Sequence, residues 1–360
     1  MNRIPFLIAG FLVFTVVFLV SCDPPSPGPA ENRMDGKPVV AVIAGGTTSF
    51  WKVTGYGASQ TAEKNDLHLV WQEASHPNDF DQQVAMIRNF AARRVQGMII
   101  VTHNDLAIRD AVKHAMDQGI YVLLIDSPPL QCMENVRSQI PVVASNQFHT
   151  GQLAAKEMAG LLQEKGRVAI IRYSPLSVKT EHREKGFLAQ MQSYPEMDVV
   201  GQDLYTGTDS RLAREKMINF LRLYSKNGIS QLDGIFISDE STACEMLALI
   251  KQDEWDKKMH FVAFGSDSRL ITGMLTSLVD AIFVEQPARM GQLAVDAMAE
   301  MLRGKTVAPF LDSGVHRVTM DNLFSPYSQA LLNTDAKNAL EILLNEFPDN
   351  QAEKIFEENQ

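Results

Sequence analysis

Polar and aromatic side chains follow the apolar runs of this chain at the points where those runs end. Thr48, Phe50 and Trp51 come after a run of mostly β-branched residues that begins at Val39, and Asp126 ends another run. A carboxylate forms charge-assisted hydrogen bonds with hydroxyl groups, and each such bond contributes about 1.5–3 kcal/mol. An aromatic face stacks on the apolar C–H face of a sugar ring. Together these residue types suit a small polyhydroxylated ligand.

Four more residues extend this set along the second half of the chain. Arg183 lies just inside a helical segment, and three other polar residues, Asp239, Asp267 and Gln286, lie shortly after further apolar runs. In an open α/β sheet, ligands bind beyond the carboxyl ends of the strands. If the apolar runs are parallel strands, all of these residues approach one cleft.

Six of these residues also have a purely structural explanation, which the sequence leaves open. The alternatives are a loop cap for Asp126, a helix N-cap for Asp239, a surface ion pair for Arg183, core packing for Phe50 and Trp51, and a hinge position for Gln286. The shared position of the residues at strand ends favours a binding site.

Short apolar runs alternate with amphipathic segments from residue 39 onward, which is typical of βαβ units around parallel sheets. We predict strands at 39–44, 67–71, 97–102, 121–126, 142–145, 167–172, 199–204, 234–238, 261–264, 281–284 and 315–320. We predict helices at 50–64, 79–94, 106–118, 150–164, 177–192, 209–225, 241–251, 270–277 and 288–303. The fold class is therefore α/β, in two similar halves. The charged segment 333–360 is either an amphipathic helix packed on the body or a solvated tail.

The composition describes a soluble protein of two domains. The chain has 360 residues, of which 45% are apolar and 21% are charged, and this length exceeds what one small core usually supports. The net charge of −10 gives no electrostatic footprint for nucleic acid. The histidines and cysteines show no metal-ligand spacing, and we interpret Cys132 and Cys244 as unpaired. No nucleophile elbow or nucleotide-binding loop occurs, so we expect no enzyme activity, metal or cofactor.

The first residues predict export. Asn2 and Arg3 form a short positive region before the apolar run 4–20, and Cys22 follows directly after it. This arrangement resembles the bacterial lipobox, whose cysteine is lipid-modified and becomes the new N-terminus. We therefore predict a lipoprotein signal peptide at 1–21, a lipid on Cys22 and a tether at 22–37. An uncut transmembrane anchor is the alternative, and both interpretations place the rest of the chain outside the cytoplasm.

Residues 39 to about 320 resemble a type I periplasmic substrate-binding protein of the ribose/galactose class. Six stretches carry the resemblance in this order: VIAGGTTSFW at 42–51, VQGMII at 95–100, VLLID at 122–126, REKGF at 183–187, GIFISDE at 234–240 and EQP at 285–287. The resemblance implies two Rossmann-like lobes with parallel sheets, which three crossovers join and which close on a ligand like a hinged clamp. The implied N-terminal lobe comprises 38–145 and 287–313, and the C-terminal lobe comprises 146–286 and 314–330. Residues 331–360 form an extension.

The resemblance also assigns roles to individual residues. Those that match the family are Phe50 and Trp51 as aromatic sugar plates, Asp126 as the hydroxyl-binding aspartate, Arg183 as the arginine of the second lobe, Asp239 as a polar ligand and Gln286 as the hinge glutamine. Ribose binders have Asp-Arg where this chain has Asp126-Ser127, Asn where it has Thr48, and Phe-Asp where it has Phe264-Gly265, with Asp267 as a substitute. We therefore expect a more acidic cleft and a ligand that donates more hydrogen bonds, such as an amino sugar or a polyol.

The expected function is that of a receptor in the periplasm or at the cell surface, anchored by its lipid. It captures a small carbohydrate and presents it to the permease of an ABC importer. A signalling receptor of the same fold, coupled to a membrane sensor, is the alternative. An exported hydrolase lacks its nucleophile elbow, and a repressor lacks its helix-turn-helix, so neither is favoured.

Overall fold

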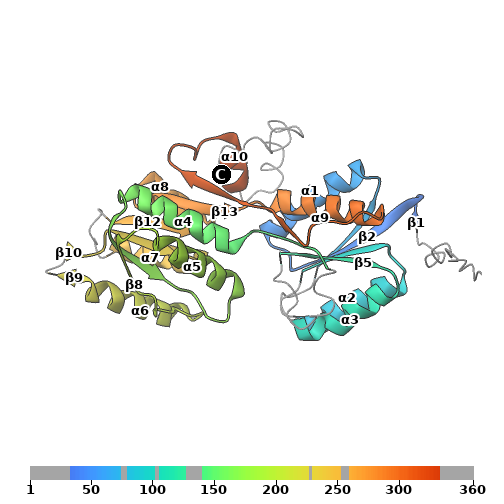
Figure 1. Ribbon diagram of the computed structural model, residues 1–360, viewed down its shortest axis with the longest axis horizontal. Coiled ribbons are helices and arrows are strands. Elements are labelled where there is room, and N and C mark those ends of the chain that lie inside the picture. Colours follow the sequence, from blue (N-terminus) through green and yellow to red (C-terminus); the bar gives the residue numbers. More distant parts are fainter. Residues whose placement is uncertain are drawn as a thin grey trace, which may run out of the picture.

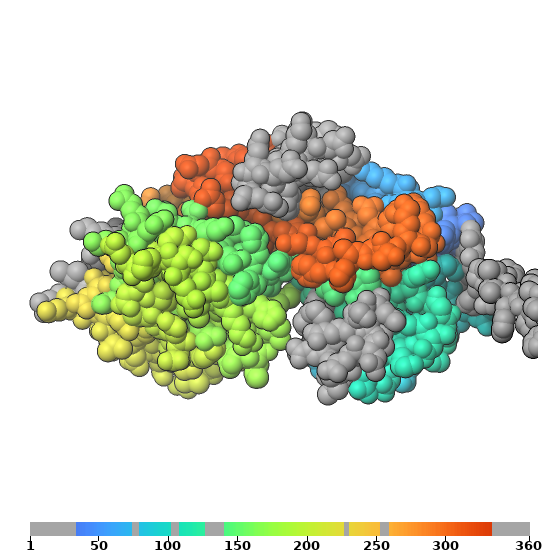
Figure 2. Space-filling model, in the orientation of Figure 1, coloured from blue at the N-terminus to red at the C-terminus, as the bar shows by residue number. Residues whose placement is uncertain are grey.

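The computed structural model describes residues 33–73, 79–101, 105–126, 140–226, 229–252 and 259–332. The chain forms two α/β lobes, each with its own central sheet between helices (Figure 1). The lobes lie side by side in the space-filling view (Figure 2). This architecture confirms the predicted fold class.

The N-terminal lobe contains a sheet in the order β1-β2-β4-β5-β6-β14, with β3 also paired to β2. Its strands are β1 (Arg33–Met34), β2 (Lys37–Ala44), β3 (His68–Glu73), β4 (Gly97–Ile100), β5 (Tyr121–Ile125), β6 (Val142–Ala144) and β14 (Phe310–Asp312). Its helices are α1 (Ser49–Lys64), α2 (Phe80–Ala92), α3 (Asp105–Asp117) and α9 (Pro287–Leu302). Every pairing in this sheet is parallel except that of β1 with β2.

Both faces of this sheet are buried, because successive side chains of a strand point to opposite faces. On β2, Val39, Ala41 and Ile43 pack into the core under α2 and α3. The alternating residues Val40 and Val42 pack into the other core, under α1 and α9. A strand buried on both faces must be apolar throughout, which is why this run was recognisable in the sequence.

The C-terminal lobe contains a sheet in the order β15-β13-β12-β11-β7-β8. Its strands are β7 (Lys165–Ile171), β8 (Glu196–Val200), β11 (Gly234–Ile237), β12 (His260–Phe264), β13 (Ala281–Glu285) and β15 (Val315–Thr319), and a small hairpin pairs β9 (Ser225–Lys226) with β10 (Ile229–Ser230). Its helices are α4 (Gln147–Leu161), α5 (Val178–Met191), α6 (Ser210–Leu223), α7 (Glu240–Gln252), α8 (Ser268–Leu275) and α10 (Pro326–Leu332). Only the edge strand β15 runs antiparallel to its neighbour in this sheet.

The chain passes between the two sheets three times, after β6, after β13 and after β14 (Figure 1). Two of these passages are bonded to each other, since Ser145 Oγ lies 3.2 Å from Ser313 Oγ. The Asn146 amide also donates to Asp312 Oδ1 at 2.9 Å. The third passage leads from Glu285 through Gln286 into α9.

Several elements differ from the sequence-based prediction. The strand predicted at 199–204 is β8 and ends at Val200, because Gly201 adopts a φ of +81° and turns the chain. The helix α10 was not predicted. It begins with Pro326, a residue favoured in the first helical turn, and Ser325 Oγ accepts a hydrogen bond from the Ser328 amide at 3.2 Å.

Several predicted features concern residues outside the described ranges: the signal peptide 1–21, the lipid on Cys22, residues 22–32 of the tether, the thiol Cys132 and the segment 333–360. Cys244 is a free, buried thiol, as expected. No helix within the described ranges is long and apolar enough to cross a membrane.

Candidate functional site

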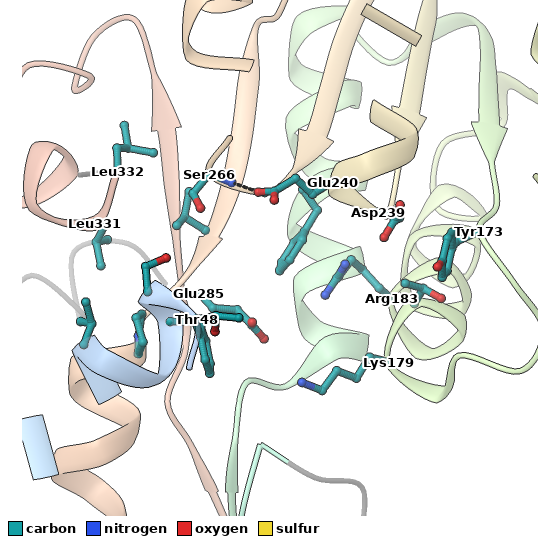
Figure 3. A pocket seen from close by; sticks show the side chains of 18 of the residues that line it. Thr48, Tyr173, Lys179, Arg183, Asp239, Glu240, Ser266, Glu285, Leu331 and Leu332 are labelled. Atoms are coloured by element: carbon teal, nitrogen blue, oxygen red, sulfur yellow. Dashed lines mark hydrogen bonds between the residues drawn. The ribbon is translucent and has the colours of Figure 1, made fainter. Parts of the chain in front are cut away.

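A cavity of about 510 Å³ lies between the two lobes. Its lining comes from Thr48, Ser49, Phe50, Val53 and Pro287 of the N-terminal lobe and from Tyr173, Ser177, Lys179, Thr180, Arg183, Asp239, Glu240, Phe264, Gly265, Ser266, Val284, Glu285, Leu331 and Leu332 of the C-terminal side. Charged side chains lie at one end, where Arg183, Lys179 and Asp239 project from their helices and loops (Figure 3). Leu331 and Leu332 lie at the opposite end (Figure 3).

The N-terminus of α1 brings one aromatic ring to this cavity and buries the next one. Thr48 occupies the N-cap position, and its side chain makes no capping hydrogen bond. Phe50 is half-buried and lines the cavity. Trp51 is only 6% exposed, packs in the core and meets Phe50 edge-on, with ring centroids 5.2 Å apart. The indole also lies against Gly45, where an added Cβ would be 3.0 Å from Trp51 Nε1.

Arg183 is the most deeply buried charged residue of the cavity lining, at 3% exposure. Its guanidinium lies 3.2 Å from the centre of the Phe264 ring, in a cation–π contact. It donates to Gln147 Oε1, at 3.0 Å from Nε and 2.5 Å from Nη2, and to the Ser238 carbonyl oxygen. Burial lowers the pKa of Arg183 to about 10, so the side chain remains charged at neutral pH.

Gln147 connects Arg183 to a carboxylate of the same lining. This glutamine is the first residue of α4, directly after the first passage between the lobes. Its Nε2 donates to Glu285 Oε1 at 2.9 Å, and Glu285 ends β13, directly before another passage. The relay Arg183–Gln147–Glu285 therefore couples the charged end of the cavity to the hinge.

Asp126 and Lys179 form an ion pair between the lobes. Asp126 follows β5 of the N-terminal lobe with a φ of +51°, and it is 6% exposed. Lys179, in the first turn of α5, places Nζ 2.5 Å from Asp126 Oδ1. Burial raises the pKa of Asp126 to about 6, although Lys179 counteracts part of that rise. Burial also disfavours the charge on Lys179, but Asp126 and Glu285 outweigh it and raise the pKa of Lys179.

Two carboxylates at the start of α7 combine a structural role with a place in the lining. Asp239 Oδ1 accepts hydrogen bonds from the Thr242 amide at 2.9 Å and from Ser241 Oγ at 2.6 Å, which caps the helix. Glu240 Oε2 accepts from the amides of Ser266 at 2.5 Å and Asp267 at 3.0 Å. Glu240 thereby fixes the loop that follows β12.

The comparison with protein families decides the assignment. A model described as "Periplasmic binding protein domain" matches residues 39–306. This chain belongs to the periplasmic binding protein family. The resemblance predicted from the six sequence stretches is thereby confirmed.

Individual relatives agree with this membership. The binding protein is 22% identical to a ribose import binding protein of Bacillus subtilis, over 82% of this chain and 93% of the relative. It is 26% identical to a D-apiose import binding protein of Actinobacillus succinogenes, over 42% of this chain and 47% of the relative, so it matches only about half of that protein. Among solved structures, an ABC transporter solute binding protein from Burkholderia graminis, in complex with D-arabinose, has a TM-score of 0.66 and 26% identity, over 81% of this chain and 99% of that chain.

The structure brings some of the predicted site residues of this binding protein together and leaves others apart. Thr48, Phe50, Arg183 and Asp239 line one cavity, and Asp126 reaches it through Lys179. Besides Asp126, which is not itself in the lining, three predicted residues lie outside it: Trp51, Asp267 and Gln286. Their side chains are engaged elsewhere, Trp51 in the core, Asp267 with Arg269 at 2.7 Å and Gln286 with the Tyr327 hydroxyl, which donates to its Oε1.

Asp267 serves α8 rather than the cavity. Its Oδ1 accepts from the Arg269 amide at 2.8 Å, which caps the helix. The hydrogen bond from the Arg269 side chain, above all, holds the pKa of Asp267 at about 2. Gly265, where the ribose binders have Asp, adopts a φ of +133°, and a Cβ there would lie 2.6 Å from Glu240 Cγ. The position therefore cannot hold an aspartate without moving Glu240.

Lys179, Glu285 and Tyr173 line the cavity but were not among the predicted site residues. Lys179 precedes Arg183 by four residues, a spacing that places two side chains on one face of a helix, so the sequence did contain its signal. Lys179 also supplies a cation that the prediction of a more acidic cleft did not include. No group of three or more His, Cys, Asp or Glu residues in the described part of the chain could hold a metal ion.

Proposed function

We propose that this protein captures a small sugar between its lobes and delivers it to an ABC importer, while a lipid on Cys22 holds it at the outer side of the membrane. The observation that carries the proposal is the composition of the cavity between the lobes. Its lining combines three aromatic rings, Phe50, Tyr173 and Phe264, with charged hydrogen-bonding groups of both signs. A pyranose or furanose ring offers apolar C–H faces and peripheral hydroxyl groups, which such a lining matches.

The hydrogen-bonding capacity of the lining supports a hydroxyl-rich ligand. Asp239 and Glu285 each use one carboxylate oxygen in the bonds described above. No hydrogen bond from another described residue reaches Asp239 Oδ2 or Glu285 Oε2. Both oxygens can therefore accept hydrogen bonds from ligand hydroxyl groups. Each such charge-assisted bond is worth about 1.5–3 kcal/mol.

The position of the cavity supports capture by closure. The lining comes from both lobes, and the passage from β13 to α9 contributes Val284, Glu285 and Pro287 to it. A ligand that contacts both lobes binds the closed arrangement better than the open one, and this difference shifts the population toward closure. An importer that recognises the closed form would then receive loaded protein in preference to empty protein.

A thermal-shift screen tests the binding step. We would prepare residues 23–360 free of ligand, then heat them with a panel of pentoses, hexoses, deoxysugars, polyols and amino sugars at 1 mM. A ligand that binds only the folded state stabilises it by about 2.7 kcal/mol at one hundred times its Kd, which raises Tm by several degrees. Calorimetric titration of each hit gives its Kd. If no sugar or polyol on the panel shifts Tm, the proposal is wrong.

The anchoring step needs its own experiment, because Cys22 lies outside the described residues. Cells that express the full chain would be fed a radiolabelled fatty acid, and the protein would be immunoprecipitated. We expect label in the wild type and none in Cys22→Ala. Equal labelling of the two proteins would refute the lipid anchor and leave sugar binding untouched.

A further inference from the structure

The ion pair between Lys179 and Asp126 joins the two lobes at the edge of the cavity. Lys179 belongs to α5 of the C-terminal lobe, and Asp126 ends β5 of the N-terminal lobe. Their contact at 2.5 Å is therefore a direct bond between the two lobes, beside the cavity that Lys179 lines. The Lys179 side chain remains 34% exposed, and an ammonium group has three donors, so Asp126 does not exhaust its hydrogen-bonding capacity.

Lys179 and Arg183 are the only cations in the described lining of the cavity. They differ in availability, because Arg183 is buried and uses three of its five N–H donors on Gln147 and the Ser238 carbonyl oxygen. Lys179 is thus the more accessible of the two cations for a ligand. The negative charges of Asp126 and Glu285 face it, and both raise its pKa. Its ammonium therefore stays charged when the cavity is empty.

We propose that Lys179 determines the charge of the ligand that this protein accepts: a neutral polyhydroxylated ligand is favoured, and an amino sugar is rejected. The inference rests on the proposed function and names the ligand class of the same site. A neutral hydroxyl can accept a hydrogen bond from Lys179 Nζ and donate one to Asp126, so it joins the ion pair without breaking it. A ligand ammonium in the same place would meet a like charge and would have to displace Lys179 from Asp126.

Matched sugar pairs test this inference directly. Three pairs are suitable: glucose and glucosamine, galactose and galactosamine, and mannose and mannosamine. In each pair, the second sugar carries an ammonium group where the first has a hydroxyl. For the pair that binds best, we expect the wild type to prefer the neutral member by at least tenfold in Kd. Lys179→Met keeps most of the side-chain length and removes the charge. We expect this variant to lower the preference at least tenfold, since the sugar ammonium can then take the place of Lys179 Nζ beside Asp126.

The chain offers a control on the same helix. Lys185 pairs with Glu181 at 2.9 Å on the surface of α5 and is 55% exposed, so Lys185→Met removes an equal charge away from the cavity. We expect it to leave the preference of the wild type unchanged. Lys179→Arg keeps the charge and should also keep the preference. If Lys179→Met does not fold, the double variant Asp126→Asn/Lys179→Met, which leaves no unpaired charge, takes its place. It also removes the like charge that an amino sugar would meet, so the preference should fall, but by less, because no carboxylate remains to pair with the sugar ammonium.

The outcomes separate this inference from the proposed function. If sugars bind but the preference is the same in Lys179→Met as in the wild type, only the role of Lys179 is refuted. The same holds if the wild type prefers the amino sugars. If neither the wild type nor any variant binds a sugar, the proposed function and this inference both fail.

Discussion

Gly151 of α4 and Gly186 of α5 lie where the two helices meet backbone to backbone. A Cβ on Gly151 would be 1.9 Å from the Arg183 carbonyl oxygen, and a Cβ on Gly186 would be 1.9 Å from the Phe148 carbonyl oxygen. Backbone atoms cannot rotate away as a side chain can, so only glycine fits at either position. This contact fixes the turn of α5 that carries Arg183 against the helix that carries Gln147.

The N-terminal lobe uses the same device on the helices α1 and α9. A Cβ on Gly57 would lie 2.1 Å from the Ala288 carbonyl oxygen, and one on Gly291 would lie 2.0 Å from the Thr54 carbonyl oxygen. In both lobes, one helix of the glycine-packed pair starts directly after a passage between the lobes. Each lobe thus anchors its hinge by a close helix pair that also carries cavity residues.

Replacing Gly151 by alanine should destabilise the protein and weaken ligand binding together. The added methyl group must push α5 away from α4, and overpacking of this kind costs about 1–3 kcal/mol or more. Urea denaturation measures the loss of stability. Calorimetric titration with the sugar found in the screen measures the loss of affinity that the displacement of Arg183 would cause. Gly160, on the same helix, is the control, because a Cβ there meets no atom within 4 Å. Gly160→Ala should be neutral or stabilising by up to about 1 kcal/mol, and equal effects of the two substitutions would contradict the packing argument.

Phe50 and Trp51 are neighbours, but their replacement should affect different quantities: stability for Trp51 and sugar affinity for Phe50. Trp51→Ala empties part of the core and should cost about 3–5 kcal/mol of stability. Phe50→Ala removes a half-buried ring that faces the cavity, so the loss of stability should be smaller. The sugar affinity should fall by about two- to tenfold, which corresponds to the loss of about 0.5–1.5 kcal/mol of stacking energy. Thermal unfolding and calorimetry separate the two effects. A Phe50→Ala variant with unchanged sugar affinity would exclude this ring from the ligand site.

The α/β lobes could be predicted because strands buried on both faces have few alternatives to apolar residues. Such runs stand out between amphipathic segments, as Val39–Ile43 does between a charged stretch and α1. Boundaries were less certain where a single backbone conformation decides them. Gly201 ends β8 through its positive φ, and nothing in the local apolar pattern shows which conformation a glycine adopts.

The site could be predicted where strand order alone brings residues together, and not where helix orientation matters. Consecutive helical residues point about 100° apart, so Phe50 and Trp51 could not both face one cavity, and the sequence-based interpretation missed this constraint. Asp126 was predicted to bind the ligand directly. Its contact with Lys179 of the other lobe could not be predicted, because it depends on how the two lobes are placed. Leu331 and Leu332 follow the predicted fold, and only the tertiary packing of α10 brings them to the cavity.

Replacing Gln147 by leucine should lower both the stability and the sugar affinity, because the buried Arg183 loses a hydrogen-bond acceptor. Arg183 would lose its bonds to Gln147 Oε1, and Glu285 would lose the donor at 2.9 Å. Buried groups left without partners cost about 1–3 kcal/mol, and charged groups cost more. We expect lower stability in urea and a weaker sugar affinity. Gln152→Leu on the same helix, at a half-buried position, is the control, and a Gln147→Leu protein as stable as this control would refute the relay.

His316 should make the stability of the hinge region depend on pH. Its Nε2 lies 2.9 Å from Ser328 Oγ, and its ring meets the Tyr327 ring edge-on, with centroids 4.9 Å apart. Burial lowers the pKa of His316 from 6.5 to about 4. The unfolded chain therefore takes up the proton first as the pH falls. The stability that the neutral histidine contributes is complete above pH 6.5 and is lost progressively down to pH 4, at a rate of at most about 1.4 kcal/mol per pH unit.

Urea denaturation at pH 7.5 and at pH 5 measures this dependence in the wild type and in His316→Gln. Other groups titrate over the same range, so the informative quantity is the difference between the two proteins at each pH. We expect the wild type to lose more stability than His316→Gln on acidification. His182, an exposed histidine on α5, serves as the control, and His182→Gln should behave like the wild type. If acidification destabilises His316→Gln as much as the wild type, the buried neutral histidine is not what anchors α10 to β15.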